Sequence, residues 1–183
     1  YNKNIGNHAE VIDIRKLKSE DIPSADYMVA GFPCQPFSVS GKGEGVEDVK
    51  SGDLGYHFYR IVRDKQPKAF LFENVGGLLT KKHISFFYEL VKLFEEAGYE
   101  ISYPKKENGD VTTLNCWEHG VPQLRKRVFV VGIRKDLGKK FMFPEPIQEK
   151  ERTNIRYAIG DLPDPDGKRN HSGYGIRKNE TTS

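Results

Sequence analysis

The chain has 183 residues, with 37% hydrophobic and 11% aromatic side chains, which is enough for one domain with a sizeable core and excludes wholesale disorder. A net charge of +3 is compatible with a polyanionic partner but does not require one. Two cysteines, Cys34 and Cys116, exclude a disulfide-rich scaffold, and their spacing is not that of a metal site. No apolar run is long enough to span a membrane and no signal-peptide pattern is present, which favours the cytoplasm.

Short apolar stretches alternate with helical patterns along the chain, which predicts an α/β protein with a mainly parallel sheet. The strands are expected, in chain order, at residues 10–12, 27–30, 69–72, 99–103, 112–116 and 127–133. A first helix is expected where apolar residues recur at i, i+4, i+7 and i+8, at Leu54, Phe58, Ile61 and Val62. A second has its apolar face at Ile84, Phe87, Val91 and Phe94, and Gly98 is placed to end it.

The composition changes near Phe143. Two prolines and a charged stretch that ends at Arg152 are typical of a linker, and a short helical pattern at residues 155–162 precedes a polar tail. We therefore expect residues 1–143 to form one incomplete domain, and residues 144–183 to be a linker and the start of another region. Because the chain does not begin with Met and ends in a polar stretch, we also expect missing segments, on the same chain or on a complementary one.

Cys34 stands between two prolines, in a Gly-Phe-Pro-Cys-Gln-Pro-Phe-Ser segment directly after the predicted strand 27–30. Loops at the carboxyl ends of parallel strands are where α/β proteins place ligands, and the prolines restrict the direction of the thiol. The glycine-rich stretch from Ser38 to Gly45 then suits a mobile lid. The arrangement favours a nucleophilic cysteine. The alternative is a buried structural thiol, which is the commoner role of a lone cysteine.

Glu73 follows the next predicted strand, so it should lie at the same sheet edge as Cys34 and could carry or share a proton there. Its alternative role is that of a carboxylate at a helix start, stabilised by the helix dipole.

Gln123, Arg125 and Arg127 alternate along an extended segment and should therefore point one way. Guanidinium groups fixed on one face suit a phosphate, a carboxylate or the carbonyl oxygen of a base. The alternative is the solvated edge of a strand that enters the core.

Together and in this order, these segments resemble the DNA (cytosine-5) methyltransferase family. The Pro-Cys segment at Cys34, the Glu-Asn-Val sequence that begins at Glu73 and the Gln-x-Arg-x-Arg sequence that ends at Arg127 match three motifs of that family. Weaker agreements fill the gaps between them, so the resemblance runs from about residue 13 to residue 134.

The resemblance implies the Rossmann-like fold of S-adenosylmethionine-dependent methyltransferases, with a mostly parallel sheet and a terminal antiparallel hairpin. It implies methyl transfer from S-adenosylmethionine to C5 of cytosine in double-stranded DNA, with the base flipped out of the duplex and Cys34 bonded covalently to C6. Glu73 would hold N3 and the amino group of the base, and Arg127, with Arg125 nearby, would contact its O2. No metal and no membrane take part.

The resemblance also assigns residues to the cofactor and to DNA. The residues expected to line the cofactor pocket are Asp13, Ile14, Pro33 and Leu54. The residues expected to touch DNA or the flipped nucleotide are Gln35, Ser38, Ser40 and Lys42. The family's glycine-rich cofactor loop, its target-recognition domain and its closing motif do not lie in the 183 residues, so we expect a partial catalytic domain that is inactive alone.

Two alternatives remain open. The chain could belong to an RNA cytosine-5 methyltransferase of the same family, although Ser38 fits the DNA enzymes, or it could be a non-catalytic remnant that binds DNA. The preferred setting is a restriction–modification system in a bacterial or phage-infected cell, which rests on analogy.

Overall fold

The computed structural model describes residues 3–33 and 54–160. The elements, in chain order, are β1 (Tyr27–Ala30), α1 (Leu54–Lys65), β2 (Ala69–Val75), α2 (Ile84–Glu96), β3 (Tyr99–Ser102), β4 (Leu114–Asn115), β5 (Lys126–Arg134) and α3 (Ile155–Ile159). Short 3-10 helices include η1 (Ser19–Asp21) and η3 (Cys116–His119). None of the helices in this part of the chain has the length and apolar character that a membrane span needs.

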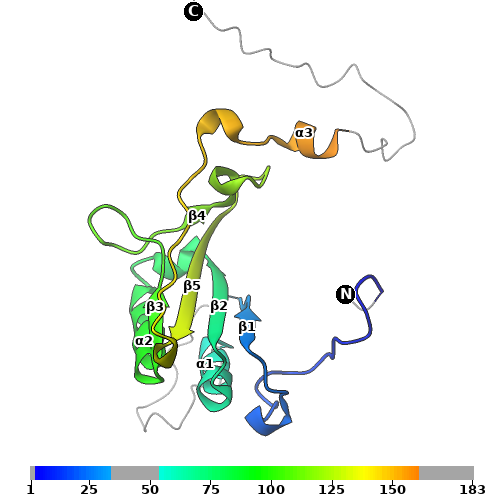
Figure 1. The fold of residues 1–183 in the computed structure, drawn as a ribbon, viewed down its shortest axis with the longest axis vertical. Helices are drawn as coiled ribbons and strands as arrows, with labels where there is room; N and C mark the ends of the chain where they lie inside the picture. Colours follow the sequence, from blue (N-terminus) through cyan, green and yellow to red (C-terminus); the bar gives the residue numbers. More distant parts are fainter. Residues whose placement is uncertain (1–2, 34–53, 161–183) are drawn as a thin grey trace, which may run out of the picture.

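The strands form a five-stranded sheet in the order β1-β2-β5-β3, with β4 pairing with β5 beyond the end of β3 (Figure 1). Strands β1 and β2 are parallel, and α1 is the crossover between them. Because β2 and β3 are both antiparallel to β5, they run in the same direction as each other. The α/β fold class is confirmed.

The sheet layout agrees with the expected one. Strands β1, β2 and β3 share one direction, and β5 forms an antiparallel pair with β3 at one end of the sheet. Three of the four strand pairings in the described residues are antiparallel. The reason is that β5 is the longest strand and pairs with three neighbours along its length.

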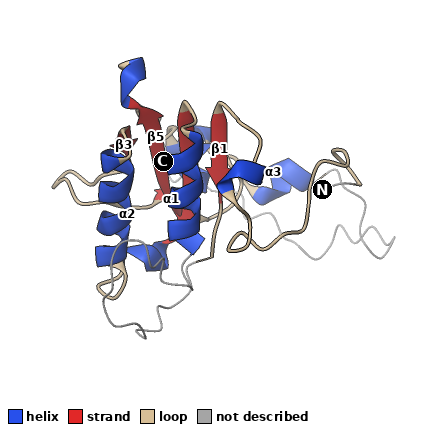
Figure 2. Ribbon diagram, turned by 90° about the horizontal axis from the view of Figure 1, so that it is seen from below, coloured by secondary structure: helices blue, strands red, loops and turns tan. Residues whose placement is uncertain are grey.

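The core lies between the sheet and helices α1 and α2, which sit on one face of it (Figure 2). Alternate side chains of β2 point to this face, so Phe70 and Phe72 are buried. The ring of Phe70 packs on Phe94 of α2, with 4.3 Å between the ring centroids. Burying each such side chain contributes about 1.5–3 kcal/mol. On the other face of β1, Tyr27 and Val29 remain exposed.

Both helices carry the predicted apolar faces, because residues at 3.6-residue spacing meet the same sheet. In α1 the residues Phe58, Ile61 and Val62 are buried, and α2 likewise buries a run of apolar residues that includes Phe87. The chain reverses after α2 at Gly98, whose φ of +96° lies in the left-handed region that favours glycine.

The predicted strand at residues 10–12 is wrong, since this segment pairs with no strand among residues 3–33 and 54–160 and Val11 is fully exposed. An apolar residue alone does not make a strand when no neighbouring backbone is available to pair with it. The strand expected at 112–116 shortens to β4, because the chain turns into η3 at Cys116.

Residues 144–153 run back along η3. The backbone N–H of Ile147 donates to Glu118 O at 2.9 Å, and Trp117 Nε1 donates to Thr153 O at 3.2 Å. The guanidinium of Arg152 lies over the Trp117 ring, 4.8 Å from its centroid. The helical pattern that follows forms α3 up to Ile159, and the residues after 160 lie outside the described range.

Candidate active site

Glu73 lies near the carboxyl end of β2, on the face opposite the one that packs on α1 and α2. Its side chain is 28% exposed. In the antiparallel pairing of β2 with β5, Glu73 is opposite Phe129 and Val75 is opposite Arg127. Glu73 and Arg127 are therefore diagonal neighbours on one face, close enough for long side chains to meet.

Two guanidinium groups converge on one oxygen of Glu73. Arg127 Nε lies 2.7 Å from Glu73 Oε1, and Arg125 Nη2 lies 3.6 Å from the same oxygen. Although Arg127 Nε is this close, its N–H is not directed at the oxygen, and among the described residues this buried atom has no hydrogen-bond partner. The contact is therefore an ion pair. The expectation that Arg125 and Arg127 point the same way agrees with this geometry.

The arginines are held by the β4–η3–β5 hairpin. Arg127 is opposite Leu114 in the β4–β5 pairing, and the backbone N–H of Cys116 donates to Arg125 O at 2.9 Å. Gln123 lies in an exposed bend before β5, so the strand expected to carry the alternation of Gln123, Arg125 and Arg127 begins only at Lys126.

The loop after β1 passes beside Glu73. A Cβ atom added to Gly31 would lie 3.8 Å from Glu73 Oε2. Asn74, which is buried beside Glu73 in β2, donates from Nδ2 to Phe32 O at 3.0 Å and accepts the Val75 N–H on Oδ1 at 2.8 Å. Residues 31–32 are thus fastened to the strand that carries the carboxylate. Sequence reasoning missed this role of Asn74. The available signal was a polar residue in the same alternating pattern as the buried phenylalanines of β2.

Cys34 and the four candidate DNA contacts lie outside the described residues, as does every other residue from 34 to 53. These candidates are Cys34, Gln35, Ser38, Ser40 and Lys42. Their roles stay predictions. Pro33, the last residue before them, is exposed at the end of the loop that Asn74 holds.

The candidate cofactor residues lie in two segments. Asp13 and Ile14 are half-buried in the N-terminal segment, and Leu54 is half-buried at the first position of α1. Arg15 donates to both carboxylate oxygens of Asp13, at 2.7–3.1 Å. The hydrogen bonds from Arg15 are the main reason that the pKa of Asp13 falls to about 2.

These residues fit a nucleoside-bearing cofactor in their chemistry. The carboxylate of Asp13 stays ionised and can accept hydrogen bonds from amino or hydroxyl groups, and Ile14 and Leu54 supply apolar surface. Arg15, whose side chain is 54% exposed, would share the carboxylate with such a ligand. The described residues contain no cluster of three or more His, Cys, Asp or Glu that could hold a metal ion.

The fold and this site define a class. A Rossmann-like α/β sheet carries a carboxylate and two guanidinium groups near the carboxyl end of β2, beside a loop from the neighbouring parallel strand. A model of the family described as C-5 cytosine-specific DNA methylase matches residues 1–183. The chain belongs to this family.

Curated relatives agree with the family. Type II methyltransferase M.FnuDI of Fusobacterium nucleatum is 44% identical over 153 residues, which cover 83% of this chain and 42% of that protein. Type II methyltransferase M.MthTI of Methanothermobacter thermautotrophicus is 39% identical over 165 residues, which cover 90% of this chain and 47% of that protein. The chain therefore spans less than half the length of these two relatives.

A solved structure has the same fold. It is the crystal structure of a prophage-encoded protein of E. coli, described as a DNA modification methyltransferase, with a TM-score of 0.61 and 27% sequence identity. The match covers 84% of this chain and 41% of that one. The prediction of a Rossmann-like methyltransferase fold is confirmed.

Proposed function

We propose that this chain is the central part of an enzyme that methylates C5 of cytosine in double-stranded DNA, within a restriction–modification system. The observation that carries the proposal is the convergence of Arg127 and Arg125 on Glu73, beside the loop that leads directly to Cys34. The family and the Type II names of the relatives support the same reading.

The two oxygens of Glu73 have different surroundings, which suits it to hold a base. Oε1 is held by the guanidinium groups, whereas Oε2 faces the backbone of Gly31. An oxygen in the second position can accept a hydrogen bond from the amino group of a cytosine flipped out of the duplex. The guanidinium groups then lie where they can contact O2 of the same ring and stabilise charge that develops on it.

Cys34 is the proposed nucleophile. Its thiolate adds to C6 of the ring, and the electron pair of the C5–C6 double bond makes C5 nucleophilic. S-adenosylmethionine, when bound, supplies the methyl group that C5 takes up. Loss of the C5 proton to a base then restores the double bond and expels the Cys34 thiolate. Gln35, Ser38, Ser40 and Lys42 are proposed to contact DNA as this segment closes over the flipped base.

Asp13, Ile14, Pro33 and Leu54 are proposed to hold the cofactor. Residues 1–143 are proposed as the catalytic part, and residues 144–183 as a linker and the start of the region that selects the DNA sequence. The hydrogen bonds of Trp117 and Glu118 to the linker would then set where that region begins relative to the arginine hairpin.

Substrate class is tested by offering the enzyme, as its gene encodes it, a duplex DNA and a transfer RNA in parallel with radiolabelled S-adenosylmethionine. We expect label on C5 of cytosine in DNA. Label on the RNA alone would overturn the choice of substrate, and label on neither would indicate a non-catalytic remnant.

The nucleophile is tested by Cys34→Ala, which we expect to abolish methyl transfer while leaving cofactor binding within about twofold of wild type. Cys116→Ala is the matched control, because Cys116 is the other cysteine of the chain and its contact with Arg125 uses only its backbone N–H. Wild-type turnover by Cys34→Ala would refute covalent catalysis by this residue.

A further inference from the structure

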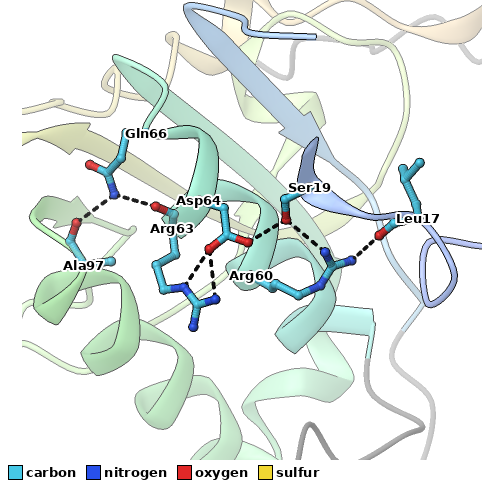
Figure 3. Close-up of polar contacts among 7 residues, drawn as sticks. All are labelled: Leu17, Ser19, Arg60, Arg63, Asp64, Gln66 and Ala97. Carbon is cyan, nitrogen blue, oxygen red and sulfur yellow. Dashed lines mark hydrogen bonds and ion pairs between the residues drawn. The ribbon is translucent and has the colours of Figure 1, made fainter. Parts of the chain in front are cut away.

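Arg60, on the second turn of α1, reaches across to the N-terminal segment and binds its backbone (Figure 3). Its Nη2 donates to Leu17 O at 2.7 Å and to Ile14 O at 3.2 Å, and its Nη1 donates to Ser19 Oγ at 2.9 Å. One guanidinium thus holds three acceptors spread over six residues, which its planar fork of donors allows.

Asp64 completes the contact from one helical turn further on. Arg60 and Asp64 are at i and i+4, so they share one face of α1. The hydroxyl of Ser19 accepts from Arg60 and donates to Asp64 Oδ2 at 2.6 Å (Figure 3). Ser19 is therefore bound by two oppositely charged side chains, and the start of η1 is fixed against the helix.

The N-terminal segment depends on its contact with Arg60 and Asp64 because few other hydrogen bonds hold it to the rest of the described chain. Residues 13–22 pair with none of the strands in the described part of the chain, and the backbone hydrogen bonds within the segment are local turns. The hydrogen bonds that join residues 13–22 to α1 are those that Arg60 donates and the one that Ser19 donates to Asp64. Removing the guanidinium would leave the carbonyls of Ile14 and Leu17 without these partners.

The held segment carries Asp13 and Ile14, and the holding helix begins at Leu54. These residues are the two sides of the proposed cofactor pocket, so the bond from Arg60 to Ile14 O fixes one side relative to the other. We infer that Arg60 is a positioning residue for the S-adenosylmethionine site, acting through the backbone of residues 14–17 without touching the cofactor. This inference rests on the proposed function.

The test compares Arg60→Met with Arg63→Met in the enzyme as its gene encodes it. Arg63 is the matched control because it lies on the same helix, where its guanidinium pairs with Asp64 and lies over the Tyr59 ring instead of binding the N-terminal segment. Three quantities are measured: the Kd of S-adenosylhomocysteine by calorimetry, the KM and kcat for S-adenosylmethionine, and amide hydrogen exchange of residues 13–22.

We expect Arg60→Met to raise Kd and KM about tenfold or more, since hydrogen bonds from a charged group are lost. Exchange in residues 13–22 should speed up, whereas kcat at saturating cofactor should stay within about twofold of wild type because Arg60 contacts no reacting atom. Arg60→Lys should recover only part of the loss, because an ammonium cannot span three acceptors as a guanidinium does. Arg63→Met should behave as wild type.

Unchanged Kd and KM in Arg60→Met, beside a wild type that binds the cofactor, would overturn the inference and leave the proposed function standing. A tenfold fall in the kcat of Arg60→Met with an unchanged KM would also overturn the inference, since that result would indicate a general structural role for Arg60. If the wild type itself binds no cofactor, the proposed function fails. Should Arg60→Met not fold, Ser19→Ala is the second variant. It removes one acceptor of Arg60 and must also raise the Kd of S-adenosylhomocysteine.

Discussion

The ion pair between Glu73 and Arg127 should couple strands β2 and β5 energetically. The two atoms are 2.7 Å apart, and the side chains are 28% and 20% exposed, between the fully buried and fully solvated cases. Exposed pairs contribute about 0–1 kcal/mol, whereas removing one partner of a buried pair costs about 3–5 kcal/mol. We therefore expect a coupling free energy of about 1–2 kcal/mol between Glu73→Gln and Arg127→Met.

The coupling is measured by urea denaturation of the wild type, both single variants and the double variant. Lys92 and Glu96 provide the control cycle, because they form an exposed i,i+4 pair on α2 with 3.7 Å between Nζ and Oε1. Glu96→Gln and Lys92→Met should couple by no more than about 0.5 kcal/mol. A Glu73 cycle no larger than the Glu96 cycle would refute the reasoning.

Three further results are expected. Burial lowers the pKa of His57, so below about pH 6.5 the unfolded chain binds a proton that the folded chain does not, and stability falls as the pH drops. His57→Gln should remove this acid-side slope, of at most about 1.4 kcal/mol per pH unit, in urea midpoints measured from about pH 7 to pH 5. Gly132→Ala should lower the free energy of unfolding by about 1–3 kcal/mol, because the new Cβ would overlap the ring of Phe70; an unchanged urea midpoint would contradict this. Trp117→Ala should speed amide exchange in residues 147–153 by freeing Thr153 O, and unchanged exchange there would show that the linker is held otherwise.

The spacing of apolar residues predicted the helices, because helix formation depends on residues that are close together in the sequence. The apolar spacing of Phe58, Ile61 and Val62 placed α1 correctly, because a helix that packs on a sheet buries residues at this interval. The position of Gly98 likewise predicted where the chain leaves α2. The resemblance identified the family, since three motifs at compatible spacings are more specific than any one of them.

The sequence pattern did not predict which distant segments of the chain pair with one another. The position of β5 between β2 and β3 is a pairing between residues far apart in the sequence, and the local apolar pattern of each strand does not reveal it. Residues 10–12 have strand-like composition but no partner strand in the described chain. Arg60 was passed over for a similar reason, because its i, i+4 relation to Asp64 is visible in the sequence but its acceptors at Ile14 and Leu17 are more than forty residues away.

The central claim is a covalent bond between Cys34 and the target cytosine. Its most direct test is incubation of the enzyme with S-adenosylmethionine and a duplex whose target cytosine carries fluorine at C5, because fluorine replaces the proton whose loss releases the thiolate. We expect a stable protein–DNA complex in which mass spectrometry of the digested protein assigns the link to the peptide that contains Cys34. Absence of a complex with DNA that the enzyme otherwise methylates, or a link to Cys116, would contradict the account.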